Sequence, residues 1–177
     1  VFIVAEAGIN HNGRIDYALE LVRAAKKTGA HAIKFQAFRA ESLCSTHDAH
    51  YSLFKRFEFG KKEWRRIHSL SKKVGIVFFA SCFDRESVDD LDELGVPLYK
   101  VASGDLTHLP LIEYIASQKK PVVLSTGMSV PSEIKTAIKA ARAFGQKHVV
   151  LLHCVSNRPA RLSELNLRAI RTLGEQY

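Results

Sequence analysis

Short apolar segments alternate with amphipathic stretches along the whole chain. Each apolar segment is followed by a stretch in which apolar residues recur every three or four positions, as Ala18, Val22 and Ala25 do, and this spacing predicts a helix with one buried face. The predicted strands are 2–5, 32–35, 76–79, 98–101, 122–124 and 149–152. Six strand–helix units in succession imply a parallel sheet, because parallel strands need crossover connections.

The expected helix ends carry recognisable signals. Asp84 is predicted to cap the helix that buries Val88 and Leu91, and Gly75 and Gly95 are expected to end helices. The last helix is predicted to contain four apolar residues, namely Leu165, Leu167, Ile170 and Leu173.

The polar residues that interrupt this pattern favour a barrel over a doubly wound sheet. No GxGxxG or Walker pattern follows any predicted strand. Instead, polar residues lie at the carboxyl ends of successive strands, where (β/α)8 barrels carry their chemistry. They are Glu6, Lys34, Gln36, Ser81, Lys100, Ser103, Asp105, Ser125, Thr126 and His153. We therefore predict an α/β fold of the (β/α)8 TIM-barrel type, with only about six βα units in the single domain 1–177.

Composition excludes several classes of protein. The net charge of +8 is spread over predicted helices without an Arg-rich tail or interleaved aromatic residues, which argues against nucleic-acid binding. No apolar run approaches the roughly 20 residues of a membrane span, and no signal peptide is visible. The three cysteines have no CxxC spacing, so we expect free thiols and a cytoplasmic location.

Two lysines within apolar strands are the first candidates for a binding site. Lys34 and Lys100 are each flanked by large apolar residues, and lysine rarely enters a parallel sheet unless it is paired or binds an anion. The alternatives are that each side chain points outward or meets a core carboxylate. Glu6 and Asp105 could transfer protons, hold sugar hydroxyls or neutralise these lysines.

Serines and glycines follow the fourth and fifth strands. Ser103 and Gly104 come before Asp105, and Ser125 begins a Ser-Thr-Gly segment. Hydroxyls and exposed amides in such loops can cradle an oxyanion, although ordinary turns use the same residues.

Histidines give weaker signals. From spacing alone, His153 is either a metal ligand or a core histidine, and a single ligand does not make a site. We interpret His11 as a loop-structure residue. The group His47, Asp48 and His50 is expected in a solvated loop.

The ordered motifs of the chain resemble the synthase family of sialic, legionaminic and pseudaminic acids. The resemblance runs nearly from end to end. It rests on the segments 5–13 (AEAGINHNG), 34–36 (KFQ), 99–105 (YKVASGD), 125–128 (STGM) and 151–154 (LLHC), followed by Asn166 and Leu167.

This resemblance implies condensation of phosphoenolpyruvate with N-acetylmannosamine or a related amino-sugar aldehyde, with release of phosphate by C–O cleavage. Lys34, Ser81, Lys100 and Ser103 would bind phosphoenolpyruvate, and Lys34 also counts among the catalytic candidates. Glu6, Gln36 and Asp105 would orient the sugar or move protons. His153 would be one of two histidine ligands to Mn²⁺ or Mg²⁺, which would polarise the aldehyde.

The resemblance also has departures. The family's Ser-Thr-Pro-Phe motif reads Ala-Ser-Cys-Phe at 80–83, and Arg158 replaces an expected tyrosine. The second metal histidine and the antifreeze-like domain that completes a partner's site in a homodimer are expected beyond this segment. Two other functions stay open: a non-catalytic sugar- or phosphate-binding protein, and a 3-deoxy-octulosonate phosphate synthase-like enzyme.

Overall fold

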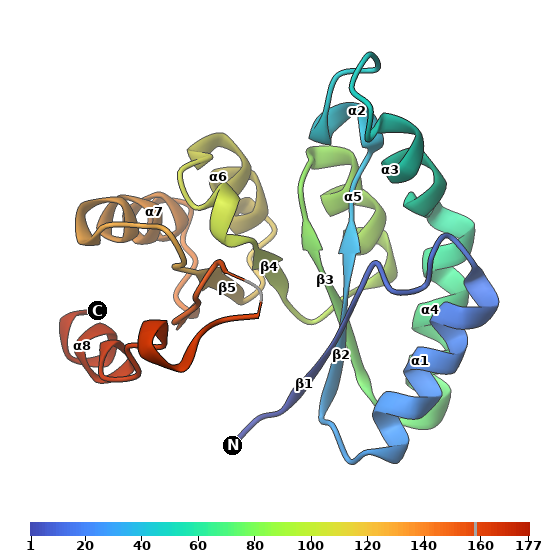
Figure 1. The fold of residues 1–177 in the computed structure, drawn as a ribbon, viewed down its shortest axis with the longest axis horizontal. Coiled ribbons are helices and arrows are strands. Elements are labelled where there is room, and N and C mark those ends of the chain that lie inside the picture. The colour runs from blue at the N-terminus through green and yellow to red at the C-terminus, as the bar shows by residue number, and fades with distance from the viewer. Residues whose placement is uncertain (158) are drawn as a thin grey trace. The chain divides into compact units, whose positions relative to one another are not determined.

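The computed structural model describes residues 1–157 and 159–177 and divides the chain into two compact units, Val1–Pro97 and Leu98–Tyr177 (Figure 1). Six parallel strands alternate with helices in the described residues, three strands in each unit. The fold is of the (β/α)8-barrel type with six of its βα units present, as the alternating sequence pattern predicts.

In the first unit, three parallel strands lie in chain order with helices between them. The strands are β1 (Val4–Gly8), β2 (Ala32–Ala37) and β3 (Val77–Cys82), and the helices are α1 (Ile15–Lys27), α2 (Ala40–Leu43), α3 (Tyr51–Phe57), α4 (Lys61–Val74) and α5 (Arg85–Leu94). Phe35 of β2 packs edge-on against Trp64 of α4, with ring centroids 6.3 Å apart. Phe78 of β3 contacts both rings, so aromatic packing joins the sheet to α4.

The predicted start and end of α5 are confirmed. Asp84 Oδ1 accepts a hydrogen bond from the Ser87 amide at 2.7 Å, which satisfies one of the free N–H groups of the first turn. Gly95 ends the helix in the left-handed region at φ 72°.

A charged network holds the connection after β2 against α5. The Arg39 amide donates to Asp84 Oδ2 at 2.6 Å, and the Arg39 guanidinium donates to the buried Asp90 at 2.6 Å and to Glu86 at 3.1 Å. Buried carboxylates need such partners, because an unpaired charge away from water costs several kcal/mol. The network fixes the chain just beyond Gln36.

In the second unit, three further parallel strands lie in chain order. The strands are β4 (Tyr99–Val101), β5 (Val122–Ser125) and β6 (Val149–Leu152); the helical segments are η1 (Ser103–Asp105), α6 (Leu109–Ser117), α7 (Pro131–Ala143), η2 (Leu162–Glu164) and α8 (Ala169–Gln176). Tyr99 and Leu124 are fully buried together with Ile112 and Ile115 of α6 and Ala137 of α7. This apolar layer packs one face of the sheet against the helices.

The prediction for the last helix was wrong at its start. Leu165 and Leu167 precede α8, which begins only at Ala169. Asn166 lies between them in the left-handed region at φ 43°, which interrupts the helical backbone. The apolar residues therefore keep helical spacing from the end of η2 through the following turn, although neither segment belongs to α8.

Two short helices occupy a region for which the sequence predicted a loop. α2 and α3 flank an exposed segment, and the Glu41 carboxylate accepts hydrogen bonds from the Tyr51 hydroxyl at 2.5 Å and from Lys55 at 3.2 Å. His47, Asp48 and His50 are exposed between the two helices, as expected of a solvated loop. Over the described residues, no helix is long and apolar enough to cross a membrane, and all three cysteines are free.

Candidate functional site

The first unit brings together charged and polar side chains from its three neighbouring strands. Lys34 Nζ lies 2.7 Å from Glu6 Oε2 and donates to Ser81 Oγ at 3.0 Å. The Lys34 side chain is 12% exposed, whereas the Glu6 side chain is 47% exposed. The ammonium is thus held in place by two fixed acceptors, while the carboxylate keeps one side open to solvent. We call Glu6, Lys34, Gln36 and Ser81 the Lys34 cluster.

An irregular end of β1 brings Gln36 beside the carboxylate. The register of β1 against β2 shifts between Glu6 and Gly8, and such a bulge re-aims the neighbouring side chains. A Cβ at Gly8 would lie 3.1 Å from Glu6 Oε1 and 3.8 Å from Gln36 Nε2, and the φ of Gly8 is 53°. Glycine therefore allows the backbone to approach both polar groups. Gln36 also pairs in register with Ser81 on β3.

The departure at Cys82 leaves the local structure intact. Cys82 is fully buried and pairs in register with Ala37, and the next residue, Phe83, donates its amide to the Ala37 carbonyl at 3.2 Å. Burial raises the pKa of the Cys82 thiol, so it stays protonated as a small apolar residue. The Ser81 hydroxyl is therefore presented by a regular strand end.

The second unit builds a separate hydroxyl-rich site around Gly127. The Gly127 amide donates to Ser103 Oγ at 3.2 Å, which joins the loops after β4 and β5. A Cβ at Gly127 would lie 2.9 Å from Ser103 Oγ and 2.8 Å from Ser156 Oγ, so only glycine fits without displacing them. Cys154 Sγ, in turn, donates to the hydroxyl of the buried Ser125 at 3.3 Å. We call Ser103, Ser125, Gly127, Cys154 and Ser156 the Ser103 cluster.

Ser156 was not identified from the sequence. It follows a strand by four residues, in a segment of ordinary loop composition, and only the space at Gly127 shows its position. In the sequence, the glycine of the Ser-Thr-Gly segment could have indicated that another part of the chain lies close to it, because glycine has no side chain in the way.

Lys100 and Asp105 lie in the same unit. Lys100 is 6% exposed and its ammonium donates to the Val101 carbonyl. Burial raises the pKa of Asp105, an effect opposed by the positive charges of His108 and Lys100. Asp105 is consequently a carboxyl group that holds its proton more tightly than an exposed aspartate does.

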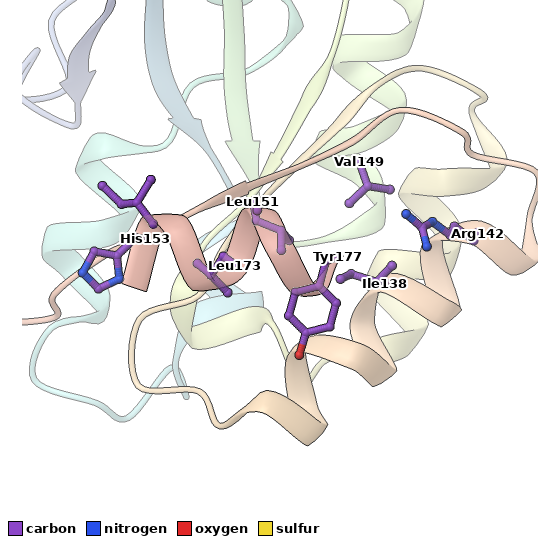
Figure 2. A pocket seen from close by; sticks show the side chains of 9 residues that line it. Ile138, Arg142, Val149, Leu151, His153, Leu173 and Tyr177 are labelled. Atoms are coloured by element: carbon purple, nitrogen blue, oxygen red, sulfur yellow. The ribbon is translucent and has the colours of Figure 1, made fainter. Parts of the chain in front are cut away.

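His153, the expected metal ligand, follows the last residue of β6. Its Nε2 lies 2.7 Å from the Leu165 carbonyl oxygen. Outside residue 158, no group of three or more histidine, cysteine, aspartate or glutamate side chains could hold a metal ion. His153 also lines a pocket between β6, α7 and α8 together with apolar residues such as Leu151 and Leu173 (Figure 2).

His11 is a loop-structure residue, as interpreted from the sequence. It is buried, its Nδ1 accepts the Gly13 amide at 3.1 Å, and its ring stacks on Phe59 with centroids 4.0 Å apart. Burial lowers the pKa of His11 to about 4, so the ring is neutral near pH 7.

Most predicted site residues thus fall into two groups. Glu6, Lys34 and Ser81 are in direct contact, and Gln36 is adjacent to them. Ser103 contacts Gly127, and His153 contacts the Leu165 carbonyl. Arg158, the departure expected to affect sugar recognition, lies outside the described residues.

Comparison with known proteins gives the family. The sequence model of the NeuB family matches residues 21–177. The chain is 46% identical to an uncharacterised protein of Methanocaldococcus jannaschii over 97% of this chain and 51% of that protein. It is 37% identical to an N,N'-diacetyllegionaminic acid synthase of Legionella pneumophila over 99% of this chain and 54% of that enzyme. The chain therefore spans about half the length of these curated relatives.

The solved structures agree with the sequence relatives. A citrate complex of N-acetylneuraminic acid synthetase from Leptospira borgpetersenii is 40% identical, with a TM-score of 0.95 over 100% of this chain and 62% of that chain. The match to the family covers most of the chain and includes both polar clusters except Glu6. The chain belongs to the NeuB family.

Proposed function

We propose that the protein condenses phosphoenolpyruvate with N-acetylmannosamine or a related amino-sugar aldehyde and releases phosphate. The observation that carries this proposal is the Lys34 cluster, in which the Lys34 ammonium pairs with Glu6 of β1 and reaches Ser81 next to the carboxyl end of β3. Barrels of this type carry their chemistry at that end of the strands. Family membership supports the reaction class, and the cluster supplies a fixed positive charge for an anionic substrate.

Two serine hydroxyls are suited to donate hydrogen bonds to an oxyanion. The oxygen of Ser81 accepts from the Lys34 ammonium, and the oxygen of Ser103 accepts from the Gly127 amide. Each hydroxyl hydrogen is then free to donate to a phosphate or carboxylate oxygen. We therefore propose that the hydroxyls of Ser81 and Ser103 bind phosphoenolpyruvate. The positive charges of Lys34 and Lys100 would bind the same anion.

The carboxyl groups suit the sugar and the proton transfers. Glu6 has one side exposed to solvent and can accept a hydrogen bond from a sugar hydroxyl, and Gln36 lies beside it. Burial raises the pKa of Asp105, so this carboxyl group keeps its proton to a higher pH than an exposed aspartate does and is a candidate proton donor. These assignments separate the residues that balance substrate charge from those that orient the aldehyde.

The proposed reaction balances without an external oxidant or reductant. A carbon–carbon bond forms between the enol carbon of phosphoenolpyruvate and the aldehyde carbon, and the aldehyde oxygen gains a proton. Water adds at the neighbouring carbon, and the C–O bond to phosphate breaks. Lys34 and Lys100 would offset the negative charge of the departing phosphate.

A requirement for Mn²⁺ or Mg²⁺ is part of the proposal, with His153 as one of the residues that would hold the ion. The ion would supply a Lewis acid that polarises the aldehyde. Chelation should abolish turnover by the full-length protein, and adding Mn²⁺ back should restore it. The homodimer is likewise a prediction, to be measured by sedimentation of the full-length protein.

The experiment is turnover with isotope-labelled substrate. The full-length protein is incubated with Mn²⁺, N-acetylmannosamine and phosphoenolpyruvate carrying ¹⁸O at the bridging oxygen. We expect phosphate that contains the label, together with a nonulosonic acid detected by mass spectrometry. Lys34→Met should remove both products, while Lys62→Met, a matched change at an exposed residue of α4, should not.

A panel of sugars separates the remaining functions. Turnover with phosphorylated aldoses alone would indicate a 3-deoxy-octulosonate phosphate synthase-like enzyme instead. Calorimetric binding of phosphoenolpyruvate without turnover on any amino-sugar would indicate a binding protein and would contradict the proposal.

A further inference from the structure

Hydrogen bonding between the β2 and β3 segments continues beyond the last residue of each strand. Ala37 and Cys82 are the last pair in register, and Phe83 donates its amide to the Ala37 carbonyl at 3.2 Å. In a regular parallel ladder, the next hydrogen bond would run from the Arg39 amide to the Phe83 carbonyl. Arg39 donates instead to Asp84 Oδ2, at 2.6 Å. The Asp84 carboxylate therefore takes the place of a backbone acceptor at this point.

Further contacts join the same two connections. Phe38 is buried and packs edge-on against Phe83, with ring centroids 6.3 Å apart. The guanidinium of Arg39 donates to Asp90 and Glu86 of α5, so both the backbone and the side chain of this residue are held. The chain after β2 is thus attached to the chain after β3 at several points.

Helix capping alone does not account for Asp84. Its Oδ1 caps α5 by accepting the Ser87 amide at 2.7 Å, and serine, threonine or asparagine could do the same. Its Oδ2 accepts an amide forty-five residues earlier in the chain. Among the residues that cap helices well, only aspartate offers two acceptor oxygens and no donor hydrogen. The carboxylate is therefore suited to hold two backbone amides from different segments at once.

The Asp84 carboxylate lies close along the chain to the Lys34 cluster. Gln36 and Ser81 pair in register one residue before the end of the ladder, and Ser81 Oγ accepts a hydrogen bond from Lys34 at 3.0 Å. The end of a strand ladder opens more easily than its centre. Joining the two chains beyond the ladder opposes this opening, which would otherwise separate Ser81 from Lys34.

We propose that Asp84 is a positioning residue, which keeps Ser81 beside Lys34 by joining the connection after β2 to the start of α5. Its effect on substrate binding rests on the proposed function, because that function assigns Ser81 and Lys34 to phosphoenolpyruvate. The hydrogen bonds of Asp84 do not depend on that assignment.

Asp84→Asn in the full-length protein tests the positioning role. The asparagine oxygen can still cap α5, whereas its NH₂ group cannot accept the Arg39 amide. We expect the KM for phosphoenolpyruvate to rise about fivefold or more, with a smaller change in kcat. The matched control is Glu63→Ala, which removes a carboxylate that accepts the Gly60 amide at the start of α4 and touches neither connection. This control should lower the Tm and leave the KM unchanged. An unchanged KM in Asp84→Asn, or an equal rise in both variants, would overturn the proposal.

A double substitution shows whether the effect passes through Ser81. If Asp84 acts by placing the Ser81 hydroxyl, Asp84→Asn should raise the KM for phosphoenolpyruvate less than about twofold when Ser81→Ala is already present. A rise of the same size with and without the hydroxyl would contradict the positioning role.

Hydrogen exchange of the Phe83 amide gives a measurement that does not need turnover. Exchange should be about tenfold faster in Asp84→Asn than in the wild type. The same is expected of Asp84→Ser, which keeps a capping hydroxyl but has only one oxygen. In Glu63→Ala the exchange should stay within about twofold of the wild type. Unchanged exchange in both Asp84 variants would overturn the proposal. Faster exchange in a protein without turnover would support it and contradict only the synthase function.

Discussion

Glu6 and Lys34 form an ion pair between adjacent parallel strands, with Nζ 2.7 Å from Oε2 and the two Cα positions in register. The pair is asymmetric, because the lysine is largely enclosed and the carboxylate is about half exposed. Glu6 therefore both orients the cation and presents an acceptor toward solvent. Because Glu6 has these two roles, replacing it with a neutral residue should affect kcat and KM differently.

Glu6→Gln should lower kcat at least tenfold without raising the KM for phosphoenolpyruvate. The substitution removes the negative charge that neutralises Lys34, so the cation remains available to an anionic substrate, while proton transfer and sugar orientation are lost. Steady-state kinetics with each substrate varied in turn measure both parameters. Glu20→Gln makes the same change at an exposed residue of α1 and should have no effect. A raised KM for phosphoenolpyruvate at unchanged kcat would show that Glu6 serves only to place Lys34.

Gly127→Ala should impair phosphoenolpyruvate binding more than stability. A Cβ there would lie 2.8 Å from Ser156 Oγ and 2.9 Å from Ser103 Oγ, so both hydroxyls would have to move. We expect kcat/KM to fall more than tenfold. The matched control is Gly174→Ala in α8, because a Cβ at Gly174 meets nothing within 4 Å and the residue lies outside both clusters. Equal activity of the two variants would remove the Ser103 cluster from the substrate site.

Lys100→Met should lower activity. Lys100 is 6% exposed, and its ammonium donates to the Val101 carbonyl. A charge-assisted contact to substrate is worth about 1.5–3 kcal/mol, so kcat/KM should fall more than tenfold. Thermal melting of the variant and the wild type checks that the loss of activity does not come from unfolding. Unchanged kinetics would exclude Lys100 from the site.

The alternation of strands and helices could be predicted from the sequence, because the spacing of apolar residues shows which face of each element is buried. Asp84 and Gly95 gave the limits of α5 for local reasons, a capping carboxylate and a left-handed backbone. The start of α8 could not be predicted, because Leu165 and Leu167 keep helical spacing while Asn166 between them has a positive φ. Apolar spacing alone does not reveal a single residue at positive φ.

The site was predictable where the chemistry was unusual for its surroundings. Lysine inside an apolar strand pointed to Lys34 and its carboxylate partner, and that contact is present. Ser156 was missed because its importance depends on packing against Gly127, twenty-nine residues away in the chain. The contact between His153 and the Leu165 carbonyl was also not predicted, since it joins two residues twelve positions apart in the chain.

Asp105 should make the protein less stable as the pH rises. Burial raises its pKa, so the folded protein binds this proton more tightly than the unfolded chain does. Its contribution to the free energy of unfolding is complete below the unfolded pKa of about 3.9 and is lost as the pH rises through the folded pKa. Asp105→Asn cannot ionise, so its Tm relative to the wild type should increase with pH across that window. A Tm difference that stays constant from pH 3 to pH 7 would contradict a raised pKa.

His11 should give the opposite pH dependence. Burial lowers its pKa from 6.5 to about 4, so the unfolded chain binds this proton more tightly. Stability from this group is complete above pH 6.5 and is lost as the pH falls toward 4, by an amount on the order of 3 kcal/mol. His11→Asn places an amide oxygen near the position of Nδ1, where it can accept the Gly13 amide, and it does not titrate.

The free energy of unfolding, measured with urea at pH 7 and pH 4.5, should therefore fall less in His11→Asn than in the wild type. The shifted pKa of His68, also lowered by burial, is common to both proteins and cancels in the comparison. An equal fall in both proteins would contradict a buried neutral His11. Because the loop of His11 follows directly on the strand of Glu6, protonation of this ring as the pH falls toward 4 should also lower activity in the wild type more than in His11→Asn.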